Sequence, residues 1–519
     1  MNSRTLGASS HAGSCRQIRT LVCWTALLAT PAAVNAQVIA VKNAPVADGG
    51  QFVFLPSANI GMGGLSIALA DSTLDPFVNP AKGARLRGTS VFGAPTFFSV
   101  SRRSGGGLTL PLGVSTSHGA WFTQFMLAMQ DIDRGNDNQQ GVFAPSTFDA
   151  LSSSRIVPPV VEQRSVSRQN RYAHATLGRR FVGGTSVAAS GSWWGLHAVD
   201  GVELYYPGSQ SVRQRGDALD LRLGVLKETK QGHSLEAVAV RNRQAVNHDV
   251  TFMDVFWNPN LRQISFVPRV APNADETETW GLHLAYSRPI ADSGWRVGAI
   301  LTGNQIRQPR LPAFGLPQVA ADAANARALN IGGGLSRISG PVTLGVDAIF
   351  EPISSRSWVD AHEDVETRAG TMLEAGTRTL DNRFRFTNGI ARAGAAVTFP
   401  FSSERWLRIE TGGQLRAIRY RLDQRDAIQE SRSSSTQHWN EWTRSWGVGI
   451  RVAGAELHYR GSLSTGAGRP GFDDQNGGFV IDDVRPLTSS SSTSFAPFGL
   501  SFGDVSATTH QISFSVPIR

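Results

Sequence analysis

The chain has 519 residues, of which 41% are hydrophobic and 18% charged, and its formal net charge is +9. This composition excludes wholesale disorder, because a disordered chain has fewer apolar residues and a larger net charge for its length. The basic residues are nearly all arginine and are scattered along the chain without a Lys/Arg block. A nucleic-acid partner is therefore not expected.

Residues 1–36 are predicted to be a cleaved signal peptide. Three arginines supply its positive charge, an apolar stretch covers 21–34, and Val34-Asn35-Ala36 forms a small-residue cleavage site. Removing those arginines leaves a net charge of +6, from 47 basic and 41 acidic residues. Cys15 and Cys23, the only two cysteines, lie in this segment, so no disulfide is expected in the mature chain.

Beyond residue 37 the sequence alternates between apolar and polar residues over stretches of about ten. In ETWGLHLAYS (278–287), Trp280, Leu282 and Leu284 share one face, while His283 lies on the other. The same pattern recurs at 218–226, 341–350, 455–463 and 511–518. Ten residues at about 3.3 Å each, tilted by about 45°, span the apolar band of an outer membrane. The pattern predicts transmembrane strands with apolar residues outward and polar residues toward a lumen.

The connections between these stretches alternate between short and long, as they do in outer-membrane barrels. Short turns are expected near 179–184, 228–232, 289–294, 339–341, 400–404 and 453–454. Long polar loops are expected at about 131–167, 200–215, 244–275, 304–327, 352–383, 421–437 and 465–507. The fold class predicted is all-β: a transmembrane antiparallel barrel of 14–16 strands over residues 89–519, preceded by a hatch segment over 37–88. A hairpin of 88–100 with 107–113 would bring the number of strands to sixteen.

Two groups of residues are candidates for a functional site. Alternation points charged side chains into the lumen, where they line a path or hold a plug; these are Asp220, Arg222, His283, Arg296, Asp347, Glu456, His458 and Arg460, with Arg408, Glu410 and Arg451. Two of the expected outer loops are unusually apolar and are candidates for ligand capture. Their residues are Leu204, Tyr205 and Tyr206 in the first, and Phe252, Met253, Phe256 and Trp257 in the second.

The stretch GMGGLSIALADSTLDPFVNPAKGARL (61–86) precedes the first expected strand. Its Gly61, Gly63 and Gly64, then Ala70-Asp71-Ser72, then Asn79-Pro80-Ala81 resemble the hatch of the FadL-type outer-membrane transporters of long-chain fatty acids and other hydrophobic compounds. In that family a glycine directly follows the alanine, whereas here Lys82 stands between Ala81 and Gly83. The second acidic residue after Asp71 is also missing. The resemblance implies passive uptake of a hydrophobic small molecule through a lumen that the hatch blocks.

The same opening is also similar to PorV-type barrels, which implies a protein-binding role in a secretion or surface-assembly system. A lipid hydrolase built on His283, His458 and a serine is the weaker third alternative, and the chain is not expected to be an enzyme. No cofactor or metal is expected. The expected partners are outer-membrane lipid, a hydrophobic ligand and the barrel assembly machinery, in the outer membrane of a Gram-negative type of bacterium.

Overall fold

The computed structural model describes residues 51–101, 105–133, 168–198, 209–258, 263–291, 293–308, 323–361, 363–402, 404–470 and 502–518. The predicted signal peptide and the first part of the predicted hatch, 37–50, lie outside these ranges, so both stay predictions. No helix within the described ranges is long and apolar enough to cross a bilayer.

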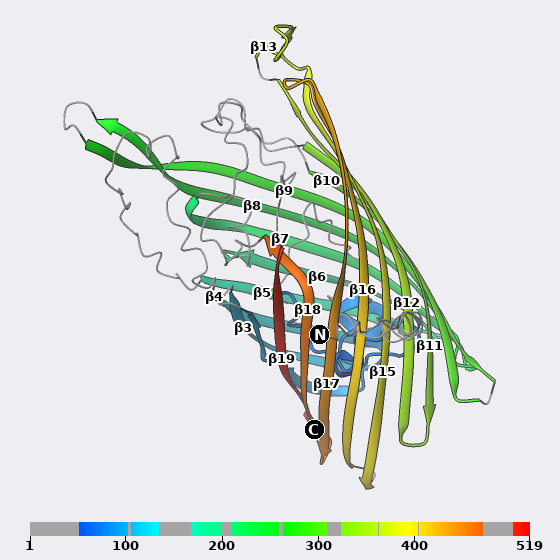
Figure 1. The fold of residues 1–519 in the computed structure, drawn as a ribbon. Coiled ribbons are helices and arrows are strands. Elements are labelled where there is room, and N and C mark those ends of the chain that lie inside the picture. Colours follow the sequence, from blue (N-terminus) through cyan, green and yellow to red (C-terminus); the bar gives the residue numbers. More distant parts are fainter. Residues whose placement is uncertain are drawn as a thin grey trace, which may run out of the picture.

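Nearly all of the described residues belong to one antiparallel sheet that closes on itself (Figure 1). The strands are β1 (Gly88–Gly93), β2 (Thr96–Val100), β3 (Gly106–His118), β4 (Trp121–Asp133), β5 (Arg168–Phe181), β6 (Thr185–Leu196), β7 (Ser209–Glu228), β8 (Ser234–Asn258), β9 (Gln263–Ile290), β10 (Trp295–Gln308), β11 (Ala323–Ser339), β12 (Val342–Asp360), β15 (Arg378–Ser402), β16 (Arg405–Asp426), β17 (Ser431–Val452), β18 (Ala455–Pro470) and β19 (Phe502–Ile518). Strands that follow one another in the sequence pair with one another, and β19 pairs back to β1 and β2. A separate short hairpin joins β13 (Val365–Glu366) to β14 (Met372–Leu373).

β1 and β2 are two halves of one strand. Both pair with β3 on one side and β19 on the other, and the register runs on from one half to the next without a shift. Ala94-Pro95 interrupts the strand because proline has no backbone N–H to donate. The barrel wall therefore has sixteen strands, which confirms the predicted range and the predicted first hairpin.

The wall is apolar on its outer face, whereas its inner face mixes polar and apolar residues. Along β4, exposed and buried residues alternate from Trp121 to Asp133. The outer face carries Phe125 and Leu127, both about half exposed, while the inner face carries the buried Gln124 and Gln130 together with apolar residues that pack against the amino-terminal segment. A soluble protein buries its apolar residues, so this inverted arrangement requires an apolar solvent around the wall. The predicted transmembrane barrel is confirmed.

The predicted short turns are confirmed, but several predicted long loops are strands. The segment 244–275 is predicted to be a loop, yet its described residues, 244–258 and 263–275, belong to β8 and β9. All 25 residues of β8 pair with β9. Most of 421–437 likewise belongs to β16 and β17. A strand of 25 residues is about 80 Å long, so the hairpins continue well beyond the membrane's apolar band. Figure 1 shows β8 and β9 and the β15–β17 group extending in this way.

The amino-terminal segment from Gln51 to Arg87 lies inside the barrel and is called the hatch below. It contains the 3-10 helix η2 (Ile60–Met62), the single-turn helix α2 (Asp75–Val78) and the 3-10 helix η3 (Pro80–Arg85). η2 contacts β15–β18, while η3 contacts β4–β7, so the hatch reaches opposite parts of the wall. In Figure 1 it is the blue segment enclosed by the strands.

Candidate functional site

Asp71 organises the hatch from within. Its buried carboxylate accepts hydrogen bonds from Ser57 Oγ at 2.6 Å and from the backbone N–H groups of Ala58, Asn59 and Leu74 at 2.9–3.1 Å. Backbone N–H groups buried without a partner are costly, so one carboxylate here satisfies several donors of an irregular segment. This explains why an aspartate stands in the middle of the predicted hatch motif.

Two of the predicted lumen residues hold the hatch to the wall directly. Asp347 Oδ2 on β12 accepts hydrogen bonds from the backbone N–H groups of Ser66 at 2.8 Å and Ile67 at 3.2 Å. On the opposite side, Arg222 on β7 donates to the carbonyl oxygens of Phe77 and Val78, both at 3.2 Å. Asp220 accepts from Arg222 Nε at 2.6 Å and so fixes the guanidinium.

Other wall residues that the sequence did not single out bind the hatch in the same way. Arg392 donates to Gly64 O at 3.0 Å, and Arg180 donates to Ala84 O and Leu86 O, both at 2.7 Å. Each of these side chains donates to a hatch carbonyl that would otherwise be buried without a hydrogen-bond partner. The hatch is therefore bound to the wall at many points along its length.

A buried ion-pair network holds the second half of the hatch. Lys82 Nζ lies 3.3 Å from Asp75 Oδ1 and 3.0 Å from Glu236 Oε1 on β8. Asn79, from the predicted motif, donates to Glu236 Oε2 at 3.2 Å and accepts from the Ala81 N–H at 3.1 Å. Burial raises the pKa of Asp75 to about 6, with Lys82 opposing the shift. Burial lowers the pKa of Lys82, but Asp75 and Glu236 raise it, and it ends above its ordinary value.

Glycines of the wall let the hatch approach closely. A Cβ built at Gly394 on β15 would lie 2.7–2.8 Å from the C and Cα atoms of Met62. A Cβ at Gly224 on β7 would lie 2.9 Å from Pro80 Cδ, and one at Gly345 on β12 would lie 2.6 Å from Leu65 Cδ1. These contacts are shorter than a side chain tolerates, so the hatch backbone occupies the space that side chains would fill.

The predicted charged residues near the short-turn end form a second network. Arg460 Nε donates to Glu410 Oε2 at 3.1 Å, and Arg408 Nε donates to the same carboxylate at 2.7 Å. His458 lies between Arg460, at 2.8 Å, and Glu456, at 3.4 Å. Arg451 is hydrogen-bonded to Glu456. This network lies beside the hatch, because Arg408 also contacts Met62 Sδ at 3.2 Å.

The remaining predicted lumen residues, His283 and Arg296, are hydrogen-bonded to residues of the wall. His283 is buried and its Nδ1 lies 2.7 Å from Thr302 Oγ1, whereas Arg296 donates to Ser287 Oγ at 2.9 Å. Neither His283 nor His458 is hydrogen-bonded to a serine. The hydrolase alternative needs such a serine, because the histidine must activate it as a nucleophile.

The prediction that the second group of apolar residues lies in a loop is wrong, while their role in ligand capture stays a prediction. Phe252, Met253, Phe256 and Trp257 belong to β8, where they pair with residues 264–269 of β9. These apolar residues and the residues between them belong to the part of β8 that continues beyond the membrane's apolar band. Leu204, Tyr205 and Tyr206 lie outside the described residues.

The structure contains an apolar patch inside the lumen that the sequence analysis did not identify. Phe384 and Phe386 on β15 pack with Ile418, Tyr420 and Leu422 on β16, and all are buried. Phe386 lies eight residues, or about 26 Å along the strand, from the Gly394 contact with the hatch, toward the long-loop end. A sequence signal for this patch exists, since in RFRF (383–386) the alternation is reversed, with aromatic residues inward and arginines outward.

A closed barrel with an apolar exterior and an internal plug defines a plugged transmembrane β-barrel. No family model matches the sequence, and no curated protein sequence matches it. Solved structures similar to this chain include a Pseudomonas aeruginosa FadL homologue, with TM-score 0.42, 12% identity, and coverage of 90% of this chain and 100% of that one.

Two toluene transporters are also similar. TbuX of Ralstonia pickettii has TM-score 0.36, 9% identity, and coverage of 89% and 97%. TodX of Pseudomonas putida has TM-score 0.37, 10% identity, and the same coverage of each chain. Similarities this weak do not assign a family or a substrate, so the function has to be argued from the site.

Proposed function

We propose that this protein is an outer-membrane barrel for the passive uptake of hydrophobic small molecules, such as long-chain fatty acids or hydrocarbons, and that the hatch closes its lumen. The observation that carries the proposal is the combination of a hatch fixed to opposite walls with an apolar patch in the lumen on the long-loop side of it. The long-loop side faces outward in barrels of this kind.

The two features have complementary roles. A hydrophobic molecule gains about 25 cal/mol for each Å² of apolar surface that it buries, so the patch around Phe386 and Tyr420 is a favourable first binding site. The polar and charged lining beside the hatch is unfavourable for such a molecule. Passage therefore requires that the hatch shift. The contacts that must break include the hydrogen bonds that Asp347 accepts from the hatch and those that Arg222 donates to it.

The resemblance of residues 61–86 to the FadL-type hatch supports the same function and a location in the outer membrane of a Gram-negative type of bacterium. In that setting, outer-membrane lipid and the barrel assembly machinery are the further partners that we propose.

The proposal is tested with purified barrel in proteoliposomes and radiolabelled oleate, with labelled sucrose as the polar control. Oleate is expected to enter vesicles that contain the barrel faster than it enters empty vesicles. Sucrose is expected to enter both at the same rate. Phe384→Ser combined with Phe386→Ser is expected to lower oleate uptake by about tenfold, because burial of an aromatic side chain contributes 1.5–3 kcal/mol. Arg383→Ser, on the same strand but facing outward, is the matched control.

Oleate entry no faster than into empty vesicles would contradict the proposal. If, in addition, a purified secreted protein bound the barrel in a one-to-one complex, the protein-binding alternative would replace it.

A further inference from the structure

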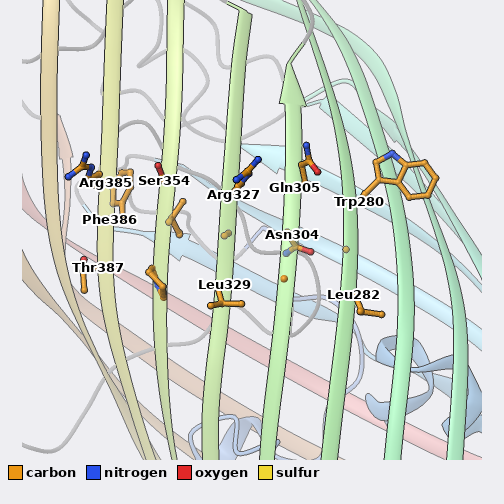
Figure 2. A pocket seen from close by; sticks show the side chains of 15 residues that line it. Trp280, Leu282, Asn304, Gln305, Arg327, Leu329, Ser354, Arg385, Phe386 and Thr387 are labelled. Carbon is orange, nitrogen blue, oxygen red and sulfur yellow. The ribbon is translucent and has the colours of Figure 1, made fainter.

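A groove of about 760 Å³ crosses five neighbouring strands, β9–β12 and β15 (Figure 2). Two of its lining side chains, Trp280 and Leu282, are more than half exposed. The lining residues that alternate with the outward-facing ones point to the lumen. Among them, Ala328, Ile353 and Phe386 are only 3–4% exposed. The groove therefore opens on the outer face of the barrel and is separate from the lumen.

The groove is built from two adjacent cross-strand rows. One row is formed by Trp280, Gln305, Arg327, Ser354 and Arg385, each of which is the Cα partner of the next. The other row lies one step closer to the short turns and contains Leu282, Gly303, Leu329, Pro352 and Thr387. The first row is largely polar and cationic, while the second is largely apolar and continues into the apolar outer face of the wall. Gly303 and Pro352 have no long side chain, which leaves the floor open.

The two arginines of the groove differ from other outward arginines nearby. Arg241 is paired with Glu278 at 3.0 Å, Arg356 with Asp381 at 2.7 Å, and Arg421 with Asp423 at 2.9 Å. Within the part of the chain that the structure describes, neither Arg327 nor Arg385 forms an ion pair; Asp423, which interacts electrostatically with Arg385, is itself paired with Arg421. They lie two strands apart, or about 10 Å, and the hydroxyl-bearing Ser354 stands between them in the row.

We propose that this groove binds a phosphate-bearing lipid of the outer leaflet. Arg327 and Arg385 hold the phosphate from two sides, with Ser354 as a further donor, and the acyl chains lie over Leu329, Pro352 and Leu282. Guanidinium groups suit phosphate because they donate paired hydrogen bonds in a fixed plane. Unpaired charges at the edge of an apolar band are favourable only where a counter-charge lies at the same depth.

The position of the groove selects the leaflet. Along β9 and β11 the cationic row lies farther from the short turns than the apolar row does. Since short turns face the periplasm in such barrels, the cationic row lies at the outer boundary of the apolar band. A lipid phosphate sits at that depth, while its acyl chains lie in the band beneath.

The test uses the full barrel, purified in dodecyl maltoside, and native mass spectrometry with bisphosphorylated lipid A as the probe. The wild-type barrel is expected to retain lipid A, and Arg327→Gln with Arg385→Gln is expected to weaken binding at least tenfold. Arg243→Gln removes an outward arginine that is already paired with Glu276 and does not line the groove, and it is expected to bind within twofold of wild type. Arg327→Lys with Arg385→Lys, which keeps both charges, is expected to bind better than the glutamine pair.

Three outcomes would overturn the proposal. In the first, the folded glutamine double variant, checked by its heat-dependent mobility on a gel, binds lipid A as tightly as wild type does. In the second, lipid A without its phosphates binds equally well. In the third, inorganic phosphate at the same concentration displaces lipid A, which would make the groove a site for the free ion.

Discussion

The backbone N–H of Ser66 in the hatch donates a 2.8 Å hydrogen bond to Asp347 Oδ2 on β12, across 281 residues of sequence. Ile67 donates a second bond to the same oxygen, so one wall carboxylate binds two consecutive amides of the hatch. Hydrogen bonds to a charged group contribute about 1.5–3 kcal/mol each. Asp347 is therefore a strong single contributor to the hatch's attachment on this side of the barrel, beside Arg392 and Ser336, which donate to the hatch carbonyls of Gly64 and Ala68.

Asp347→Ala is expected to loosen the hatch. A cysteine placed at the buried Ala68 should then react with a water-soluble maleimide at least tenfold faster, because the local opening becomes more favourable by 1.4 kcal/mol or more. Asp381→Ala is the matched control, since Asp381 pairs with Arg356 on the wall and contacts no hatch residue. Equal labelling rates in the Asp347 variant and the wild type would show that the bond does not hold the hatch.

Adding a methyl group to Gly394 is expected to displace the hatch. A Cβ there would overlap the backbone of Met62, and backbone atoms have no alternative rotamer with which to yield. Gly389→Ala, on the same strand, is expected to be neutral, because nothing lies within 4 Å of its Cβ position. The measurement is single-channel conductance in planar bilayers, where Gly394→Ala should show ion leakage and Gly389→Ala should not. A leak of the same size in both variants would contradict this account of the wall glycines.

The hatch is expected to dock more firmly as the pH falls from about 6 to about 4. Burial raises the pKa of Asp75 to about 6 in the docked hatch, whereas a released hatch would have the ordinary value of 3.8. The docked state binds the proton more tightly, so docking is favoured as the pH falls and is weakened as the pH rises through this window. The equilibrium constant for docking of the hatch changes by at most about tenfold per pH unit.

Hydrogen exchange of the amides of residues 60–70 measures this dependence, with the exposed turn at 182–184 as the reference for intrinsic rates. Asp75→Asn should abolish the dependence between pH 5 and 6, because asparagine does not titrate. The prediction would be refuted if the wild-type hatch amides, after correction for intrinsic exchange rates, exchanged more slowly at pH 7 than at pH 4.5.

Tyr420→Ser is expected to weaken the capture of hydrophobic ligands without loosening the hatch. Tyr420 is buried in the apolar patch with Phe386, at a ring-centroid distance of 5.0 Å, and none of the described hatch residues belongs to that patch. Binding of a fluorescent fatty acid should weaken about tenfold, while maleimide labelling at position 68 stays at the wild-type rate. Unchanged fatty-acid binding would show that the ligand does not use this patch.

Much of the barrel follows from the sequence alone. The alternation at 278–287 correctly places Trp280 outward and His283 inward, since successive side chains on a strand must face opposite sides. The extent of β8 could not be predicted in this way. Beyond Arg241 the outward residues of that strand, such as Arg243 and Asp249, are polar, while Val246 and Val250 face inward and are buried. The apolar-outward alternation that marks the membrane band therefore disappears while the backbone pairing with β9 continues.

The hatch contacts could not be predicted either, although the hatch motif itself was found. Which wall residue meets which hatch residue depends on how the closed barrel sets opposite strands around the segment. Asp347 and Arg222 were predicted to point inward, but their hatch partners lie more than a hundred residues away in the sequence. Gly394 and Gly224 looked like ordinary strand glycines, because only the folded barrel shows that the hatch occupies the space beside them.

A reversible disulfide between hatch and wall tests most directly whether transport requires the hatch to move. Leu65 Cγ lies 3.7 Å from a Cβ built at Gly345 on β12, so Leu65→Cys with Gly345→Cys brings two sulfur atoms within bonding reach. The chain's own cysteines lie in the predicted signal peptide and would not compete. Labelled oleate uptake into proteoliposomes should fall at least tenfold when the pair is oxidised and recover on reduction with dithiothreitol. Uptake at the same rate in the oxidised and reduced barrels would contradict a lumen that the hatch must open.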